Sequence, residues 1–168
     1  MIRRMACLGL LLAASGGAHA AEPLVPPPQG APLLLEVEAD GVQIYVCEPK
    51  DQGFQWLLKA PEANLFDKQG MQIGAHYAGP TWKLNDATIT GEVVGKADAP
   101  ASGAIPWLLL KAKSHEGSGA AATAFIRRAE TKGGLAPTTG CDASHRDEQV
   151  SHALLRALSV LRRGQVGR

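Results

Sequence analysis

The feature of this chain that most constrains its fold is a succession of short runs with strand character, each bounded by turn-forming residues. Residues 42–47, 54–60 and 88–93 are rich in β-branched and aromatic side chains, which pack well on a pleated sheet. Asp40-Gly41 and Asn85-Asp86 supply turn chemistry beside two of these runs. Because short strands at fairly regular spacing are typical of sandwiches and barrels, the sequence predicts an all-β fold, an antiparallel β-sandwich or β-barrel of about seven or eight short strands.

The amino-terminal part differs in composition from the rest. Residues 1–20 carry Arg3-Arg4, an apolar run and a small-residue cleavage pattern ending at Ala20, which predicts a signal peptide. Residues 21–32 contain five prolines and are expected to form an extended arm, because such a run excludes a helix. The β domain is expected over residues 33–145. We therefore expect a periplasmic or extracellular protein without an integral membrane span, since the apolar run is far shorter than the roughly 20 residues that a spanning helix needs.

Residues 146–168 change character again. Val150 and the leucines of this tail recur at a spacing that covers one face of a helix. Ser144 and Gly164 stand where such a helix would begin and end. The pattern predicts a C-terminal amphipathic helix.

Two cysteines remain once the signal peptide is removed, Cys47 and Cys141. In an oxidising compartment a disulfide is their expected state, and the chain-entropy model gives it roughly 4 kcal/mol of stabilisation. The alternatives are a pair of metal ligands or a redox couple, but neither cysteine has the CxxC partner typical of those roles. We predict a structural Cys47–Cys141 disulfide.

The charge balance argues against one class of partner. Between positions 21 and 145, ten lysines and arginines stand against fourteen acidic residues, so the main body is mildly acidic. Nucleic-acid binding needs a basic surface that neutralises phosphates, and this part of the sequence shows no such cluster. We expect no nucleic-acid partner, and the sequence leaves the oligomeric state open.

A short segment near the middle of the chain concentrates ring side chains around a bend. His76, Tyr77 and Trp82 lie close together in a chain with 5% aromatic residues, and Gly79-Pro80 interrupts the strand between them. In one interpretation these rings fill a core. In the other they face a sugar or another apolar ligand, with His76 and Asp86 supplying hydrogen bonds. His76 is also a candidate donor to a backbone carbonyl beside Trp82, where it would hold the bend.

Catalytic and metal sites are weakly indicated. Gly117-Ser118-Gly119 lacks the GxSxG spacing of a nucleophilic serine on a sharp turn, and turns and exposed faces explain the acidic residues better than a glycosidase pair does. His76, His115 and His145 show no HxH or HxxxH spacing for a metal ion. We assign no catalytic residue, no metal ligand and no cofactor.

Three segments occur together in a recognisable order: residues 74–82 (GAHYAGPTW), residues 105–108 (IPWL), and residues 131–142, which begin TKGGLAP and end GCD. Over residues 33–145 the chain resembles the DUF3455 family of secreted bacterial and fungal proteins, a domain of unknown function. The resemblance implies a secreted β-rich domain with both cysteines at family positions, and it implies no activity.

The chain departs from that family in two places. Asn85-Asp86-Ala87 stands where the family usually has Asp-Gly-Ser. Beyond His145 the family normally ends on an aromatic, β-branched strand, which this sequence does not show. We therefore expect the tail to be either a helical replacement or the product of a frame shift in the gene. A missing strand would leave an unpaired sheet edge.

Taken together, the residues favour a non-catalytic secreted domain that binds a carbohydrate or a cell-envelope component through His76, Tyr77, Trp82 and Asp86. A hydrolase that uses His76 or a carboxylate is the first alternative. A structural or stress-related envelope protein without a small-molecule site is the second.

Overall fold

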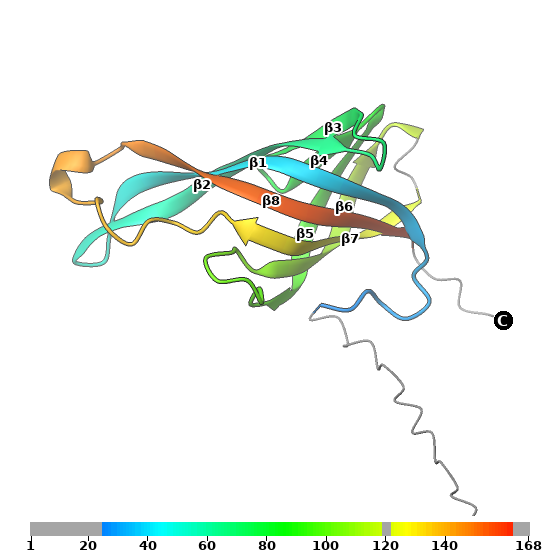
Figure 1. The fold of residues 1–168 in the computed structure, drawn as a ribbon, viewed down its shortest axis with the longest axis horizontal. Helices are drawn as coiled ribbons and strands as arrows, with labels where there is room; N and C mark the ends of the chain where they lie inside the picture. The colour runs from blue at the N-terminus through cyan, green and yellow to red at the C-terminus, as the bar shows by residue number, and fades with distance from the viewer. Residues whose placement is uncertain (1–24, 119–121, 163–168) are drawn as a thin grey trace, which may run out of the picture.

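The computed structural model describes residues 25–118 and 122–162, with side chains in the last strand described as far as Leu155. The predicted signal peptide therefore lies outside the described residues. Eight antiparallel strands, each paired with the next and the last with the first, form a closed barrel (Figure 1). This confirms the all-β prediction and selects the barrel over the sandwich. The strands are β1 (Leu33–Lys50), β2 (Gly53–Phe66), β3 (Gln72–Tyr77), β4 (Thr81–Leu84), β5 (Ala87–Ala97), β6 (Trp107–Glu116), β7 (Thr123–Gly133) and β8 (Gln149–Arg162).

The carboxyl-terminal tail forms β8, so the predicted helix is wrong. β8 pairs with β1 from Leu33↔Leu161 to Val46↔Gln149 and with β7 on its other side. Burial also alternates with a period of two, since Leu154 is buried between two exposed neighbours. A strand satisfies the backbone groups of two open sheet edges, which a helix cannot do. The closing strand is present in the described chain, so the unpaired sheet edge expected from its loss does not occur there.

The turn predicted at Asp40-Gly41 is also wrong, because β1 runs straight through it. Gly41 lies opposite Ala63 of β2. A Cβ atom at position 41 would overlap the backbone carbonyl oxygen of Glu62 and the Cα of Ala63. The glycine therefore permits a close approach between two strands. The turn predicted at Asn85-Asp86 is confirmed between β4 and β5, with Asn85 in the left-handed region at φ 51°.

The barrel interior is divided into an apolar and a more polar part. The apolar part is a cluster of buried side chains that includes Leu65, Trp82, Ile89, Leu110 and Ile126. Buried polar side chains, among them Gln43, Tyr45 and Thr131, occupy other inward positions of β1 and β7. A second, smaller cluster joins Val25 of the proline-rich arm to Trp107 and Ala129. The described part of the arm therefore packs against β6 and β7.

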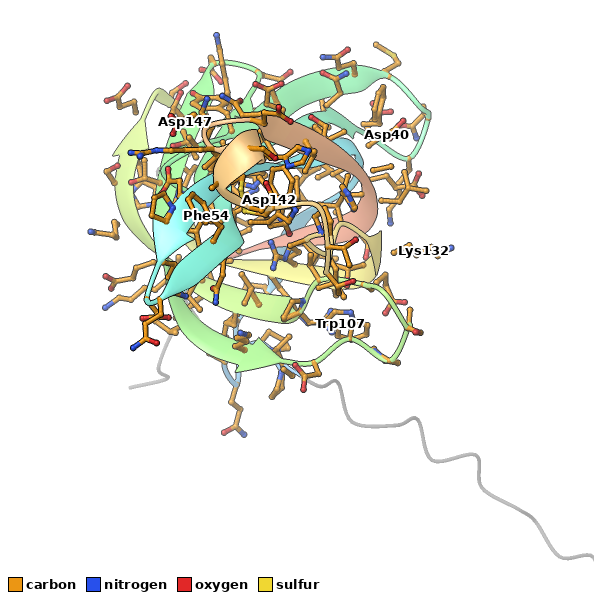
Figure 2. The ribbon with its side chains drawn as sticks, turned by 90° about the vertical axis from the view of Figure 1, so that its left-hand side faces the viewer. Asp40, Phe54, Trp107, Lys132, Asp142 and Asp147 are labelled. Carbon is orange, nitrogen blue, oxygen red and sulfur yellow. A yellow bond between two sulfur atoms is a disulfide. The ribbon has the colours of Figure 1, made fainter. Side chains whose placement is uncertain are left out.

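One end of the barrel is covered by the chain that leads into β8. Cys47 and Cys141 form a disulfide with a Cα–Cα distance of 5.4 Å. A 3-10 helix at Ala143–His145 follows, and Cys47 exchanges backbone hydrogen bonds with Asp147 and Glu148. Figure 2 looks onto this end and shows Asp142 near the middle of the view, in the segment that crosses it. The described residues contain no helix long and apolar enough to span a membrane.

The wall between β2 and β5 is complete at only one end of the barrel, because β3 and β4 are short. β2 pairs with β3 only from Ala63 to Phe66, and β5 pairs with β4 only from Ala87 to Thr90. In the described chain, residues 53–62 of β2 and 92–97 of β5 therefore have a strand neighbour on one side alone. In Figure 1 the β1–β2 hairpin (cyan) extends well beyond the labelled β3 and β4.

Candidate ligand-binding site

A cleft of about 290 Å³ opens where β2 and β5 lack a common neighbour. It reaches from the surface to the barrel interior, so its lining includes exposed side chains and side chains of the buried core. Its walls are mostly apolar, and its size is at the lower end of the range typical of small-molecule sites. The lining residues are Leu58, Lys59, Ala60, Pro61, His76, Ala78, Gly79, Pro80, Trp82, Val93, Leu108, Leu110 and Arg128.

His76 and Trp82 form the aromatic part of this cleft. They face each other as a cross-strand pair of β3 and β4, and their rings stack with centroids 4.6 Å apart and planes 13° apart. The two side chains are only 4% and 3% exposed. Trp82 thus packs in the interior cluster while part of it lines the cleft. Both interpretations of this tryptophan, core filling and contact with a ligand, are compatible with this position.

A hydrogen bond fixes the orientation of the His76 ring. Its Nδ1 lies 2.8 Å from the backbone carbonyl oxygen of Thr81. Because a carbonyl oxygen only accepts, Nδ1 carries the proton and donates. Thr81 in turn donates from Oγ1 to the carbonyl of Ala78 at 2.9 Å, and Gly79 adopts φ 83°. The structure therefore confirms that His76 bonds a carbonyl beside Trp82 and helps to hold the Gly79-Pro80 bend.

The other two predicted site residues do not line the cleft. Tyr77 follows His76 on β3, and side chains alternate between the faces of a strand, so Tyr77 is 40% exposed on the outer face. Asp86 lies in the turn between β4 and β5 and accepts a hydrogen bond from Ser118 Oγ at 2.8 Å. A ligand role for Tyr77 and Asp86 stays a prediction separate from the cleft.

Arg128, a charged residue of the cleft, is not among the site residues predicted from the sequence. It lies on β7 opposite Leu108 of β6, and its Nε and Nη2 donate to the carbonyl oxygen of Pro106 at 3.2 and 2.8 Å. Burial lowers the pKa of Arg128 to about 10, and the nearby Tyr45 opposes that shift. The guanidinium therefore remains charged at neutral pH. Arg128 follows the buried Ile126 by two residues on β7, and the period of two in a strand places both side chains on the same face.

Arg128 has no carboxylate partner among the described residues. The ion pairs there are Lys68–Glu36, His145–Asp142 and Arg146–Asp147. The neighbouring Arg127 points to the opposite face, where it lies 5.4 Å from the ring centre of Trp107 and donates to the carbonyl of Val25. A partly buried cation without an anion beside it is unusual, because burial of a charge is normally compensated by pairing.

A larger hollow of about 540 Å³ lies elsewhere on the barrel, among residues of β1, β7 and β8. Its polar side chains, Glu38, Asp40, Glu130 and Lys132, are all exposed and carry charges of both signs. Its described lining contains none of the predicted site residues and no buried polar side chain. The smaller cleft is therefore the better candidate for a binding site.

Asp142, Ser144 and His145 have the residue types of a hydrolase triad, but their contacts differ from one. Ser144 Oγ donates to Asp142 Oδ1 at 2.6 Å, and His145 Nδ1 lies 2.8 Å from the same oxygen. In a triad the serine instead bonds the histidine nitrogen that faces away from the aspartate. All three residues belong to one exposed turn, in which Asp142 caps the 3-10 helix. The cluster is a turn cap.

This cap yields a first prediction. Hydrogen bonds from Ser144 and His145 lower the pKa of Asp142, and the hydrogen bond to Asp142 raises the pKa of His145. The His145 interaction is therefore complete below the ordinary histidine pKa, about 6.5, and is lost as the pH rises through the raised value. In an NMR titration we expect Asp142→Asn to lower the His145 midpoint toward the ordinary value. Glu148→Gln, which removes a weaker contribution, should lower it less. An equal change in both variants would contradict the assignment.

No metal site is formed in the described chain, where no group of three or more His, Cys, Asp or Glu side chains lies close enough to hold an ion.

No curated protein and no solved structure matches the chain. A family model described as "Protein of unknown function (DUF3455)" matches residues 27–153, which cover the barrel from the arm into β8. The chain therefore belongs to the DUF3455 family.

Proposed function

We propose that this barrel is a non-catalytic binding domain of an exported protein, and that its ligand enters the cleft between β2 and β5. The observation that carries the proposal is the cleft itself. Apolar side chains from β2, β5 and β6, together with the His76–Trp82 stack, surround a space that reaches the barrel interior. The Cys47–Cys141 disulfide supports export, because disulfides persist mainly in oxidising compartments.

The composition of the cleft favours binding over hydrolysis. A hydrolase needs a nucleophile or a pair of carboxylates near the bond that breaks. The described lining residues include no serine, threonine, cysteine, aspartate or glutamate. His76 also uses its Nδ1 proton to hold the Thr81 carbonyl. These facts support a binding role for His76 and Trp82. The apolar walls favour an apolar cell-envelope molecule over a carbohydrate as the ligand.

Two adjacent valines allow a matched test of the cleft. Val93 lines it and Val94 does not, yet both are 52% exposed. The neutral dye N-phenyl-1-naphthylamine, which fluoresces in apolar surroundings, serves as the probe. We expect the wild type to bind it, Val93→Trp to weaken binding at least tenfold by filling the cleft, and Val94→Trp to bind as the wild type does. An absence of dye binding to the wild type, or equal effects of both substitutions, would refute the proposed function.

A further inference from the structure

The charge and the apolar walls of the cleft together specify a class of ligand. We propose that the cleft binds a small amphipathic anion, whose single acidic head group pairs with Arg128 and whose apolar part lies between β2 and β5 against Trp82 and Leu110. This inference rests on the proposed function and adds the ligand class to it.

The head group is inferred from Arg128. A guanidinium has five N–H donors, and the two hydrogen bonds to the Pro106 carbonyl use only part of this capacity. That carbonyl is neutral, so the positive charge has no anion beside it among the described residues. A carboxylate matches the fork of donors and forms charge-assisted hydrogen bonds, which are stronger than neutral ones. An acidic head group would thus compensate the charge that burial leaves unpaired.

The apolar part is inferred from the two strand edges at the mouth. Leu58 of β2 and Val93 of β5 line the cleft and are 56% and 52% exposed. Large exposed apolar side chains that meet at one hollow are typical of binding sites. Behind them Leu108, Leu110 and Trp82 extend the same apolar surface inward. Contact with these side chains would remove apolar area from water on both molecules.

The volume sets how many atoms of a ligand the cleft can enclose, and a larger molecule such as the dye would extend out of its open mouth. At the ~30 Å³ that a water molecule occupies in the liquid, 290 Å³ corresponds to roughly ten non-hydrogen atoms. A chain of about eight carbons with a carboxylate has this size. The second charged lining residue, Lys59, bonds the Gln149 side chain at 3.0 Å and is exposed. The charged side chains of the described lining, Lys59 and Arg128, are both positive, so a cationic or zwitterionic head group is disfavoured.

The test compares three eight-carbon probes on the intact, disulfide-bonded protein by isothermal titration. Octanoate is expected to bind at least ten times more tightly than 1-octanol, since a hydrogen-bonded charge pair contributes a factor of ten or more. Octylammonium is expected to bind more weakly than 1-octanol. Acetate, which has the head group alone, is expected not to bind measurably. Equal affinities for octanoate, 1-octanol and octylammonium would overturn the inference.

Substitution of the arginine locates the head group. Arg128→Met is expected to lower octanoate affinity at least tenfold and to abolish the advantage of octanoate over 1-octanol, and Arg128→Lys is expected to lie between the wild type and Arg128→Met. Unchanged octanoate binding in Arg128→Met would overturn the assignment. Because Arg128 also holds the Pro106 carbonyl, a second measurement uses the wild type alone. Octanoate binding should weaken to about the level of 1-octanol as the pH falls through the pKa of the free acid, about 4 to 5, while 1-octanol binding should stay constant. Parallel curves for the two probes would contradict the inference.

These experiments separate the inference from the proposed function. If the neutral dye binds and Val93→Trp blocks it, while octanoate shows no advantage over 1-octanol, the cleft is a binding site for neutral apolar molecules and the anion inference fails alone. If neither the dye nor any of the eight-carbon probes binds, both fail.

Discussion

Replacement of Gly41 by valine is expected to destabilise the barrel by about 4 kcal/mol or more, at the extreme of single-substitution effects. A Cβ atom at this position would overlap backbone atoms of Glu62 and Ala63 in β2, and backbone cannot move aside as the end of a flexible side chain can. β1 and β2 would have to separate within the part of their pairing that runs without a register shift from Glu38↔Phe66 to Ile44↔Ala60. Because native domains are stable by only about 5–15 kcal/mol, such a loss is a large fraction of the total.

Gly53 provides the matched control for this prediction. It lies at the start of β2, and a Cβ atom there would meet nothing within 4 Å. Gly53→Val is therefore expected to change the free energy of unfolding by less than about 1 kcal/mol, as surface substitutions usually do. Guanidinium denaturation of both variants, with the disulfide intact, gives the comparison. Similar midpoints for Gly41→Val and Gly53→Val would show that the close approach of β1 and β2 is absent in solution.

Gly41 also shows which parts of the fold can be read from local sequence. Asn85-Asp86 and Asp40-Gly41 carry the same kind of turn signal, yet only the first forms a turn. At Asn85 the left-handed backbone is a local requirement that asparagine meets. The reason for glycine at position 41 lies 22 residues further along the chain, at Ala63. Strand character was therefore predictable, whereas the continuity of β1 depended on a non-local contact.

The error at the tail has a similar origin. Val150, Leu154 and Leu155 fit a helical spacing as well as a strand, because short apolar patterns are ambiguous between the two. The choice is made by tertiary structure. β1 and β7 each present an open edge, and β8 pairs with both. The spacing of apolar residues in the tail carries no information about these two edges. Local propensity therefore predicted the wrong structure for the segment that closes the barrel.

The candidate site was partly predictable for a physical reason. His76 and Trp82 lie on either side of a glycine-proline bend, so a hairpin brings them together whatever the rest of the chain does. Arg128 lines the same cleft only because closure of the barrel places it there from β7, and this needs the complete strand order. The size of the cleft depends on the shortness of β3 and β4, which sequence periodicity does not determine. The pairing of His76 with Trp82 can therefore be predicted from residues close together in the sequence, whereas the position of Arg128 depends on the whole fold.

Removal of the disulfide should have the second large effect. Cys47 and Cys141 are separated by 94 positions, and the chain-entropy model assigns a crosslink of this span about 4 to 5 kcal/mol of stabilisation through the unfolded state. The bond also holds the segment before β8 against the end of β1, where Cys47 bonds Asp147 and Glu148. We expect Cys47→Ala/Cys141→Ala to lower the free energy of unfolding by this amount, measured by guanidinium denaturation.

The wild type in reducing agent provides the control, because reduction breaks the crosslink without changing the sequence. Its unfolding midpoint should approach that of the double variant, whereas the double variant should not respond to reductant. Because the stabilisation acts mainly on the unfolded chain, the folded cleft should survive, and N-phenyl-1-naphthylamine should bind the double variant with unchanged affinity below its unfolding transition. A loss of less than about 1 kcal/mol would show that the two thiols are not joined, since a crosslink closing so long a loop is expected to contribute several times more.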